Sequence, residues 1–298
     1  MSRSIVAITG ASGFLGRALV ARALAAGKRV RGLDLVPDHE GSPSIELLRG
    51  DVSDPAACAA LCAGAEIVYH TAAVVRESGP MALFERVNVG GTGAMLVAAR
   101  RAGVRHFVMI SSVMVHGFDF PDGVPEDGPT GGFDNPYCAT KIRSEALALA
   151  AHEPGVFDVY VVRPGDVYGP GSIPWTERPG PLVLRAVSTL DRAASVLGRE
   201  LEMNREAVRY VLRHGQYGIE RIKALGYTPR IGLDEGMARS VAWLREKGRA
   251  VNAGHVTAAG ASGLRVSAPS PAMIFSRRAR KSATPSQRPA SGTATSEM

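Results

Sequence analysis

A glycine-rich turn near the start of the chain constrains the fold more than any other feature. The apolar run Ile5–Thr9 leads into Gly10. Gly13 and Gly16 follow, and residues 15–26 have the Ala/Leu-rich composition of a helix. In such a turn the first glycine permits a tight bend, the second lets the backbone approach a pyrophosphate, and the third lets the helix pack on the strand. An ordinary turn is the weaker alternative, because the order strand, glycine turn, helix is typical of a dinucleotide-binding site.

Short apolar segments alternate with helical patterns through the first half of the chain. We expect strands at residues 5–9, 29–33, 45–48, 67–70, 106–111 and 156–162. We expect helices at residues 15–26, 55–63, 81–102 and 136–152. This alternation predicts an α/β fold, a doubly wound parallel sheet with helices on both faces. Ligands of such sheets bind beyond the carboxyl ends of the strands, which is where the motifs below fall.

The positive charge of the chain is concentrated at its C-terminal end. The net charge is +7, and residues 249–298 account for +6 of it with seven basic residues and one acid. The remaining +1 on residues 1–248 argues against a nucleic-acid-binding body. Residues 249–298 are rich in Ala, Ser, Pro, Thr and Gly and hold a single aromatic, so we expect a disordered basic tail.

The rest of the composition argues against a membrane protein. No apolar run approaches the roughly 18 residues of a membrane span. The first strand begins so early that we expect no signal peptide. The three cysteines Cys58, Cys62 and Cys138 do not form a disulfide framework. We therefore expect a cytoplasmic protein, without a metal site and without a nucleic-acid partner.

An acidic residue follows the second expected strand. Asp34 lies 24 residues after the first glycine of the turn, about where an acid accepts the adenosine ribose hydroxyls of a dinucleotide. Its carboxylate would repel the 2′-phosphate of NADP, and the next residues, Leu35 and Val36, offer no guanidinium, so NAD is the expected cofactor. A surface aspartate without this role is the weaker alternative. By the same geometry Asp51 and Val52, after the third strand, are expected near the adenine.

A candidate catalytic pair lies on the fourth expected helix. Tyr137 and Lys141 are four residues apart and share one helix face, just after Pro136. Tyrosine is a poor base at its unperturbed pKa of about 10, and lowering that pKa to about 7 needs about 4 kcal/mol. One ammonium about 4 Å away supplies about that much at an effective dielectric constant of about 20. Ser111 and Ser112 precede the pair at a strand end, where a serine hydroxyl can polarise a substrate oxygen.

Together these motifs resemble the extended branch of the short-chain dehydrogenase/reductase superfamily, which includes the NAD-dependent epimerase/dehydratase and 3β-hydroxysteroid-dehydrogenase-like proteins. The resemblance covers residues 4–186 and resumes over residues 225–248. It rests on residues 9–16, 51–52, 70–73, 88–92, 111–112, 137–141, 163–171 and 225–229.

The resemblance implies roles for individual residues. Ser112 would be the catalytic serine, Tyr137 the acid/base and Lys141 its activator. Asn88 would anchor neighbouring backbone rather than substrate. The implied cofactor-binding set, whose last two members would approach the nicotinamide, is Gly10, Ser12, Gly13, Phe14, Leu15, Gly16, Asp34, Asp51, Val52, Thr71, Ala72, Ala73, Tyr137, Lys141, Pro164 and Gly165.

Two departures from the family pattern narrow the substrate. Family dehydratases carry Asp-Glu directly after the catalytic hydroxyl residue, where this chain has Val113 and Met114. These side chains cannot transfer protons, so dehydration of a sugar nucleotide is not expected. Many sugar-nucleotide epimerases have Asn where this chain has Asp166, whose charge disfavours a diphosphate. The second departure favours a less anionic substrate, such as a secondary alcohol of sterol or reduced-aromatic type, with a sugar nucleotide as the alternative.

The substrate-binding half is shorter than the family pattern. After residue 186 the expected further strands and helix are missing, and the chain passes to helical stretches at 205–214 and 233–247. The expected organisation is an NAD-binding Rossmann-like domain at 1–186, a truncated, mostly helical substrate region at 187–248, and the tail at 249–298.

Two functions fit this organisation. The first is an NAD-dependent oxidoreductase or epimerase that transfers hydride between a secondary alcohol carbon and nicotinamide. The alternative is a non-catalytic NAD-binding or redox-sensing protein that has lost its substrate pocket. The resemblance also suggests a homodimer formed through the helices at 81–102 and 136–152.

Overall fold

The computed structural model describes residues 4–38, 44–76, 78–118, 120–172 and 216–246. The chain divides into two units, Met1–Arg249 and Ala250–Met298, and every described residue lies in the first. The helix expected at 205–214 and the tail expected at 249–298 lie outside the described residues. The three-part organisation expected from the sequence therefore stays a prediction.

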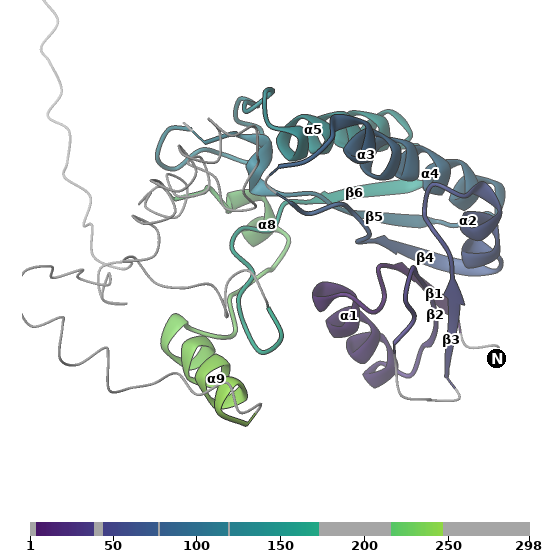
Figure 1. Ribbon diagram of the computed structural model, residues 1–298, viewed down its shortest axis with the longest axis horizontal. Helices are drawn as coiled ribbons and strands as arrows, with labels where there is room; N and C mark the ends of the chain where they lie inside the picture. The colour runs from purple at the N-terminus through teal and green to yellow at the C-terminus, as the bar shows by residue number, and fades with distance from the viewer. Residues whose placement is uncertain (1–3, 39–43, 77, 119, 173–215, 247–298) are drawn as a thin grey trace, which may run out of the picture. The chain divides into compact units, whose positions relative to one another are not determined.

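The described residues of the first unit form one sheet of six parallel strands (Figure 1). The strands are β1 (Ile5–Thr9), β2 (Arg29–Asp34), β3 (Ile45–Arg49), β4 (Ala65–His70), β5 (His106–Ile110) and β6 (Asp158–Val162). Their order in the sheet is β3-β2-β1-β4-β5-β6: successive strands are added toward one edge from β1 to β3 and toward the other edge from β4 to β6. This order confirms the predicted Rossmann-like α/β fold. Thr9 is level with Leu33 of β2 and with His70 of β4, so the carboxyl ends of these strands form one edge.

Helices pack on both faces of the sheet. The helical segments are α1 (Phe14–Ala25), α2 (Pro55–Cys62), α3 (Met81–Phe84), η1 (Glu85–Gly90), α4 (Gly91–Arg101), η2 (Val113–Val115), α5 (Pro136–Ala150), α8 (Glu220–Ala224) and α9 (Leu233–Glu246). Figure 1 shows α1 on one face and α2, α4 and α5 on the other. On the α1 side, Val20 packs with Ile8 and Val30 of the strands. On the opposite side, Leu61 and Met95 pack with residues such as Phe107.

The helix predicted at 81–102 is broken into three consecutive segments. A short α-helix, α3, passes into the π-helical turn η1 and then into α4. Asn88, which lies in η1, is 2% exposed, and its side chain bonds the backbone of Val74. A π turn is a frequent device at functional sites, and here it contains the residue that anchors the segment after β4. Apolar spacing alone predicts the helix but not this local change of pitch.

Two helices follow the undescribed segment 173–215. The first, α8, was not predicted, and the second, α9, confirms the helix predicted at 233–247 to within one residue. The Glu126 carboxylate accepts the Arg221 N–H at 2.8 Å, and Asp127 pairs with the Arg221 guanidinium at 2.6 Å. These contacts attach α8 to the loop that precedes α5.

Candidate active site

The glycine turn adopts the close-packed form that its sequence predicts. Gly10 has φ +64°, a conformation that side chains rarely adopt, and its N–H donates to the Leu33 carbonyl at 2.8 Å. A Cβ on Gly16 would lie only 2.0 Å from the Gly10 carbonyl oxygen, so α1 can approach the turn only because this residue is glycine. Gly13 is the N-cap of α1 and provides no side-chain cap, which leaves the first turn of the helix open to a ligand.

Asp34 lies at the carboxyl end of β2, beside the glycine turn. Its Oδ2 accepts the N–H of Ser12 at 3.0 Å, and its Oδ1 accepts the N–H of Val36 at 3.2 Å. The carboxylate is therefore held in place at the turn, 22 residues from Ser12 in sequence. The structure brings together the two parts of the predicted dinucleotide site.

Asp51 and Val52 occupy different environments. Val52 is buried and belongs to the core on the α2 and α4 side. Asp51 accepts the Ser53 N–H at 2.9 Å and pairs with the Arg86 guanidinium at 3.0 Å. Burial alone would raise the pKa of Asp51, but these two partners outweigh it and hold the pKa below its ordinary value. Their expected place near the adenine stays a prediction.

The segment Thr71, Ala72, Ala73 is tied to the end of β1. The hydroxyl of Thr9 accepts the N–H groups of both Thr71 and Ala72 at 3.0 Å. A Cβ on Gly10 would lie 2.8 Å from the Thr71 hydroxyl oxygen, so the glycine turn and this segment are in direct contact. Ala72 packs against the buried core.

A buried histidine lies directly behind this segment. His70 is 3% exposed, with its Nδ1 3.0 Å from the Thr9 hydroxyl and its Nε2 3.1 Å from the Thr92 hydroxyl. Since the Thr9 hydroxyl already accepts two N–H groups, its one proton goes to Nδ1. Nε2 therefore carries the ring proton and donates to Thr92, which in turn donates to the Asn88 carbonyl at 2.6 Å. Burial lowers the pKa of His70 to about 3, with the Lys141 charge adding to the effect.

Asn88 anchors the far end of the same segment, as expected. Its Oδ1 accepts the Val74 N–H at 2.8 Å, and its Nδ2 donates to the Val74 carbonyl at 3.3 Å and to the Thr140 hydroxyl at 3.1 Å. Because Thr140 lies on α5 beside Lys141, this contact ties the strand end to the helix that carries the candidate catalytic pair.

Ser112 and Tyr137 meet at the end of β5. The Ser112 hydroxyl caps η2 by accepting the Met114 N–H at 3.1 Å, and it lies close enough to Tyr137 to act against the rise of the Tyr137 pKa. Tyr137 is in the first turn of α5, which begins at Pro136 and is capped by the Asn135 side chain, which accepts the Tyr137 N–H at 3.0 Å. An Asn-Pro pair before a helix is a readable start signal that fixes where Tyr137 lies.

Lys141 lies one helical turn beyond Tyr137 and is 5% exposed. Its Nζ donates to the Ile110 carbonyl at 2.8 Å and lies 5.8 Å from the centre of the Tyr137 ring. Burial lowers the pKa of Lys141 to about 8, although the Glu145 carboxylate opposes this. Burial likewise raises the pKa of Tyr137 to about 12, against the hydrogen bond from Ser112. In the chain alone, the Tyr137 pKa is thus raised rather than lowered as the sequence predicts, because burial outweighs the contribution of Ser112.

A buried ion pair that sequence reasoning missed supports this helix. Arg163, just after β6, binds Glu145 of α5 through Nε at 2.9 Å and Nη2 at 2.5 Å, and its Nη1 donates to the Glu126 carbonyl. Glu145 lies one turn beyond Lys141 and is 4% exposed. The bidentate geometry is the strong form of an arginine–carboxylate contact.

Pro164 and Gly165 lie just beyond the carboxyl end of β6. The Val113 N–H donates to the Pro164 carbonyl at 3.1 Å, which places this segment beside Ser112. A Cβ added to Gly165 would meet no atom within 4 Å. The neighbouring Ser111 Oγ is buried and has no hydrogen-bond partner among the described residues. A buried hydroxyl without a partner marks a place where a ligand or a water molecule can complete its hydrogen bonding.

The structure therefore brings the predicted site residues to one edge of the sheet. The glycine turn, Asp34, the segment after β4, Ser112 and the segment after β6 all lie at carboxyl strand ends. Within the described residues, no group of three His, Cys, Asp or Glu side chains is arranged to hold a metal ion. No described helix is both long and apolar enough to span a membrane.

Comparison with known proteins identifies the family. The NAD dependent epimerase/dehydratase family matches residues 6–207. The chain belongs to this family. This epimerase/dehydratase chain is 35% identical over 179 residues to the 3 beta-hydroxysteroid dehydrogenase/Delta 5→4-isomerase of Mycobacterium tuberculosis, an alignment that covers 56% of the chain and 48% of that protein. It is 33% identical over 238 residues to the ceramide reductase of Caulobacter vibrioides, covering 78% of the chain and 64% of that protein. It spans about half the length of several curated relatives that it matches.

Solved structures agree with this placement of the epimerase/dehydratase chain. MoeE5 in complex with UDP-glucuronic acid and NAD is 26% identical, with a TM-score of 0.64 over 82% of this chain and 99% of that one. The dTDP-glucose 4,6-dehydratase DesIV of Streptomyces venezuelae, with NAD bound, is 26% identical, with a TM-score of 0.60 over 81% of this chain and 97% of that one. The predicted membership of the extended short-chain dehydrogenase/reductase group is confirmed.

Proposed function

We propose that this chain binds NAD along the carboxyl edge of its sheet and oxidises a secondary alcohol, or reduces the matching ketone, with Ser112, Tyr137 and Lys141 as the catalytic residues. The observation that carries the proposal is that Ser112 interacts with Tyr137 closely enough to act against the rise of its pKa, with Lys141 one helical turn away. This group lies on the same sheet edge as the glycine turn and Asp34. Relatives named as dehydrogenases, reductases and dehydratases support it.

The residues at the edge fit NAD. The Gly10–Gly16 contact leaves no room for a side chain between the helix and the turn, and the uncapped first turn of α1 offers N–H groups to a pyrophosphate. The Asp34 carboxylate supplies the acceptor for ribose hydroxyls. The orphaned hydroxyl of Ser111 and the buried ammonium of Lys141 offer further polar groups deeper in the site.

The three catalytic residues divide the proton chemistry between them. Bound NAD supplies the carbon that accepts or donates the hydride. In the oxidation, the C–H bond of the alcohol breaks with its electron pair leaving as hydride, and Tyr137 takes the hydroxyl proton. Ser112 donates a hydrogen bond to the substrate oxygen, and Lys141 stabilises the tyrosinate. Reduction runs the same steps backwards, with neutral Tyr137 as the acid.

The substrate class follows from the side chains beside Ser112. Val113 and Met114 carry no proton-transfer group, so these two positions do not supply the acid and base that family dehydratases have there. Asp166 is a carboxylate at the position where many sugar-nucleotide epimerases have an asparagine. A secondary alcohol or ketone of sterol type is therefore the proposed substrate, and a sugar nucleotide is the alternative.

The test combines binding and turnover on the full chain. Thermal unfolding is followed with and without saturating NAD, because a ligand that binds only the folded state raises the midpoint by mass action. NADH formation is then measured with panels of secondary alcohols and of sugar nucleotides. A midpoint shift together with turnover supports the proposal. A midpoint shift without turnover on either panel would overturn the catalytic proposal in favour of an NAD-binding sensor, and no shift would overturn both.

A further inference from the structure

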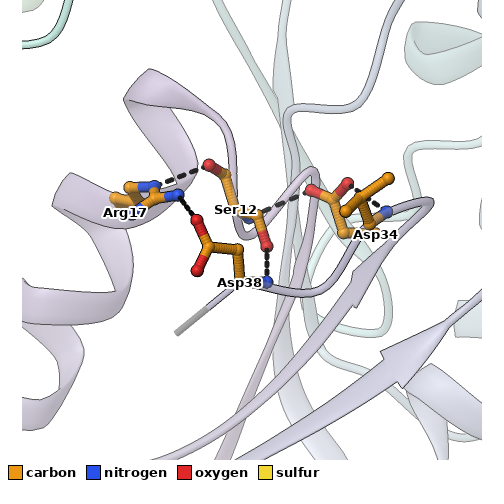
Figure 2. Close-up of polar contacts among 5 residues, drawn as sticks. Ser12, Arg17, Asp34 and Asp38 are labelled. Carbon is orange, nitrogen blue, oxygen red and sulfur yellow. Dashed lines mark hydrogen bonds and ion pairs between the residues drawn. The ribbon is translucent and has the colours of Figure 1, made fainter. Parts of the chain in front are cut away.

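Ser12 is the centre of a polar cluster formed with Arg17, Asp34 and Asp38. Its N–H donates to Asp34, its hydroxyl accepts the Asp38 N–H at 2.9 Å, and its carbonyl accepts Nε of Arg17 at 2.7 Å. Figure 2 shows Asp34 on one side of Ser12, with Arg17 and Asp38 on the other. Arg17 and Asp38 close the cluster through an ion pair of 2.6 Å between Nη2 and Oδ2. Arg17, Asp34 and Asp38 are therefore each hydrogen-bonded to Ser12 of the glycine turn.

The cluster bears directly on the difference between NAD and NADP, which is one phosphate on the 2′-oxygen of the adenosine ribose. If Asp34 receives the ribose hydroxyls, that phosphate would be close to Ser12. A guanidinium is the side chain best suited to bind a phosphate, since its N–H groups match two oxygens at once. Arg17 is such a group, yet one of its terminal nitrogens and its Nε are already bonded to Asp38 and Ser12.

We infer that Asp38 is a second determinant of cofactor selectivity, because it neutralises and holds Arg17 and so denies the 2′-phosphate a cation. The inference rests on the proposed binding of NAD at this edge. It extends the selectivity beyond the repulsion by Asp34 to a residue that touches neither the glycines nor the end of β2. It also predicts that Arg17 becomes a phosphate ligand once its partner is removed.

The ion pair itself contributes little to stability, which makes the inference testable. The side chains of Arg17 and Asp38 are 50% and 70% exposed, and exposed pairs contribute at most about 1 kcal/mol. An Asp38→Asn variant therefore folds, and it keeps the size and shape of the side chain. Glu46→Gln is the matched control, because Glu46 also pairs with an arginine, Arg31, at 2.7 Å and its side chain is half exposed.

The experiment measures the dissociation constants of NAD and NADP by calorimetric titration for the wild type and for four variants: Asp38→Asn, Arg17→Gln, the double variant and Glu46→Gln. We expect Asp38→Asn to bind NADP about tenfold more tightly, a change of about 1.4 kcal/mol, with NAD affinity within about twofold. Adding Arg17→Gln should abolish the gain. In high salt the gain should shrink, since exposed charges are screened. Glu46→Gln should leave both affinities as in the wild type.

The outcomes separate this inference from the proposed function. If the wild type binds NAD but Asp38→Asn leaves NADP affinity unchanged, the inference is wrong and the proposed NAD site stands. A gain in NADP affinity that survives Arg17→Gln would also overturn it, because the gain would then come from lost repulsion alone. A wild type that binds neither cofactor would overturn the proposed function, and the inference with it.

Discussion

Arg163 holds Glu145 through two guanidinium nitrogens, one helical turn beyond Lys141. The contact joins the end of β6 to the buried side of α5. It also places a compensated negative charge close to the candidate catalytic lysine; burial lowers the pKa of Lys141, and the Glu145 carboxylate offsets part of that lowering. The Arg163–Glu145 pair therefore both attaches β6 to α5 and influences the pKa of Lys141.

Arg163→Met should destabilise the chain by about 3 kcal/mol, because it leaves the buried Glu145 charge without its partner. Chemical unfolding of the wild type and the variant measures the loss. The double variant Arg163→Met/Glu145→Gln should recover part of it, since no uncompensated charge remains. Lys223→Met is the control, because Lys223 belongs to an exposed pair with Glu220, and it should cost less than about 1 kcal/mol. Equal losses in the two single variants would contradict the prediction.

Tyr137→Phe should reduce kcat by about 10²- to 10⁴-fold, since the variant lacks the group that exchanges the substrate proton. Its NAD affinity should change much less, because the ring is retained. Steady-state kinetics on the best substrate of the panel, with NAD titrations in parallel, checks both statements. Tyr160→Phe removes a hydroxyl from a half-exposed tyrosine of β6 and serves as the control. Full turnover by Tyr137→Phe would exclude this residue as the acid/base.

Gly16→Ala should weaken NAD binding and lower the midpoint of thermal unfolding, because the added Cβ would lie 2.0 Å from the Gly10 carbonyl oxygen and push α1 off the turn. Gly93→Ala is the matched control within α4. A Cβ there meets no atom within 4 Å, so alanine should stabilise that helix by roughly 0.5–1 kcal/mol. Thermal scans with and without NAD distinguish the two variants. A Gly16→Ala chain that behaves like Gly93→Ala would show that the turn relaxes at no cost.

Stability should fall as the pH drops below about 6.5, the ordinary pKa of histidine. The folded-state pKa of His70 is lowered to about 3. Between about pH 3 and pH 6.5 the unfolded chain therefore binds a proton at this residue and the folded chain does not. The free energy of unfolding should therefore fall by up to about 1.4 kcal/mol for each pH unit below 6.5, and be independent of this group above it. Unfolding curves from pH 8 to 5 measure the slope. His70→Gln should remove most of it, and an identical slope in the variant would refute the assignment.

Sequence patterns predict most of the sheet because its signals are local. Each strand matches its predicted range to within about two residues, since each contains a short apolar stretch that alternates along the chain with a helical pattern. The π turn η1 has no such signal. Its residue Asn88 bonds the backbone of Val74, 14 residues away, and such a contact is not encoded in local apolar spacing.

The same distinction holds at the candidate site. Motif spacing predicts that Gly10, Asp34 and Ser112 lie at strand ends and that Tyr137 lies on a helix, and the parallel topology brings the strand ends together. Spacing does not predict that Arg163 pairs with Glu145, because a pair across two elements depends on how they pack. Nor does it predict the direction of the Tyr137 pKa, which is decided by how deeply the fold buries the ring.

The absence of a side-chain cap at Gly13 has a thermodynamic consequence for the chain. Serine or aspartate at this position would stabilise α1 by about a few tenths of a kcal/mol, but its oxygen would occupy the N–H groups of the first turn. An anion bound there accepts hydrogen bonds from the same N–H groups that a side-chain cap would bind. Helix stability and anion binding are therefore coupled at this turn. An anion stabilises α1 more when the helix has no side-chain cap of its own.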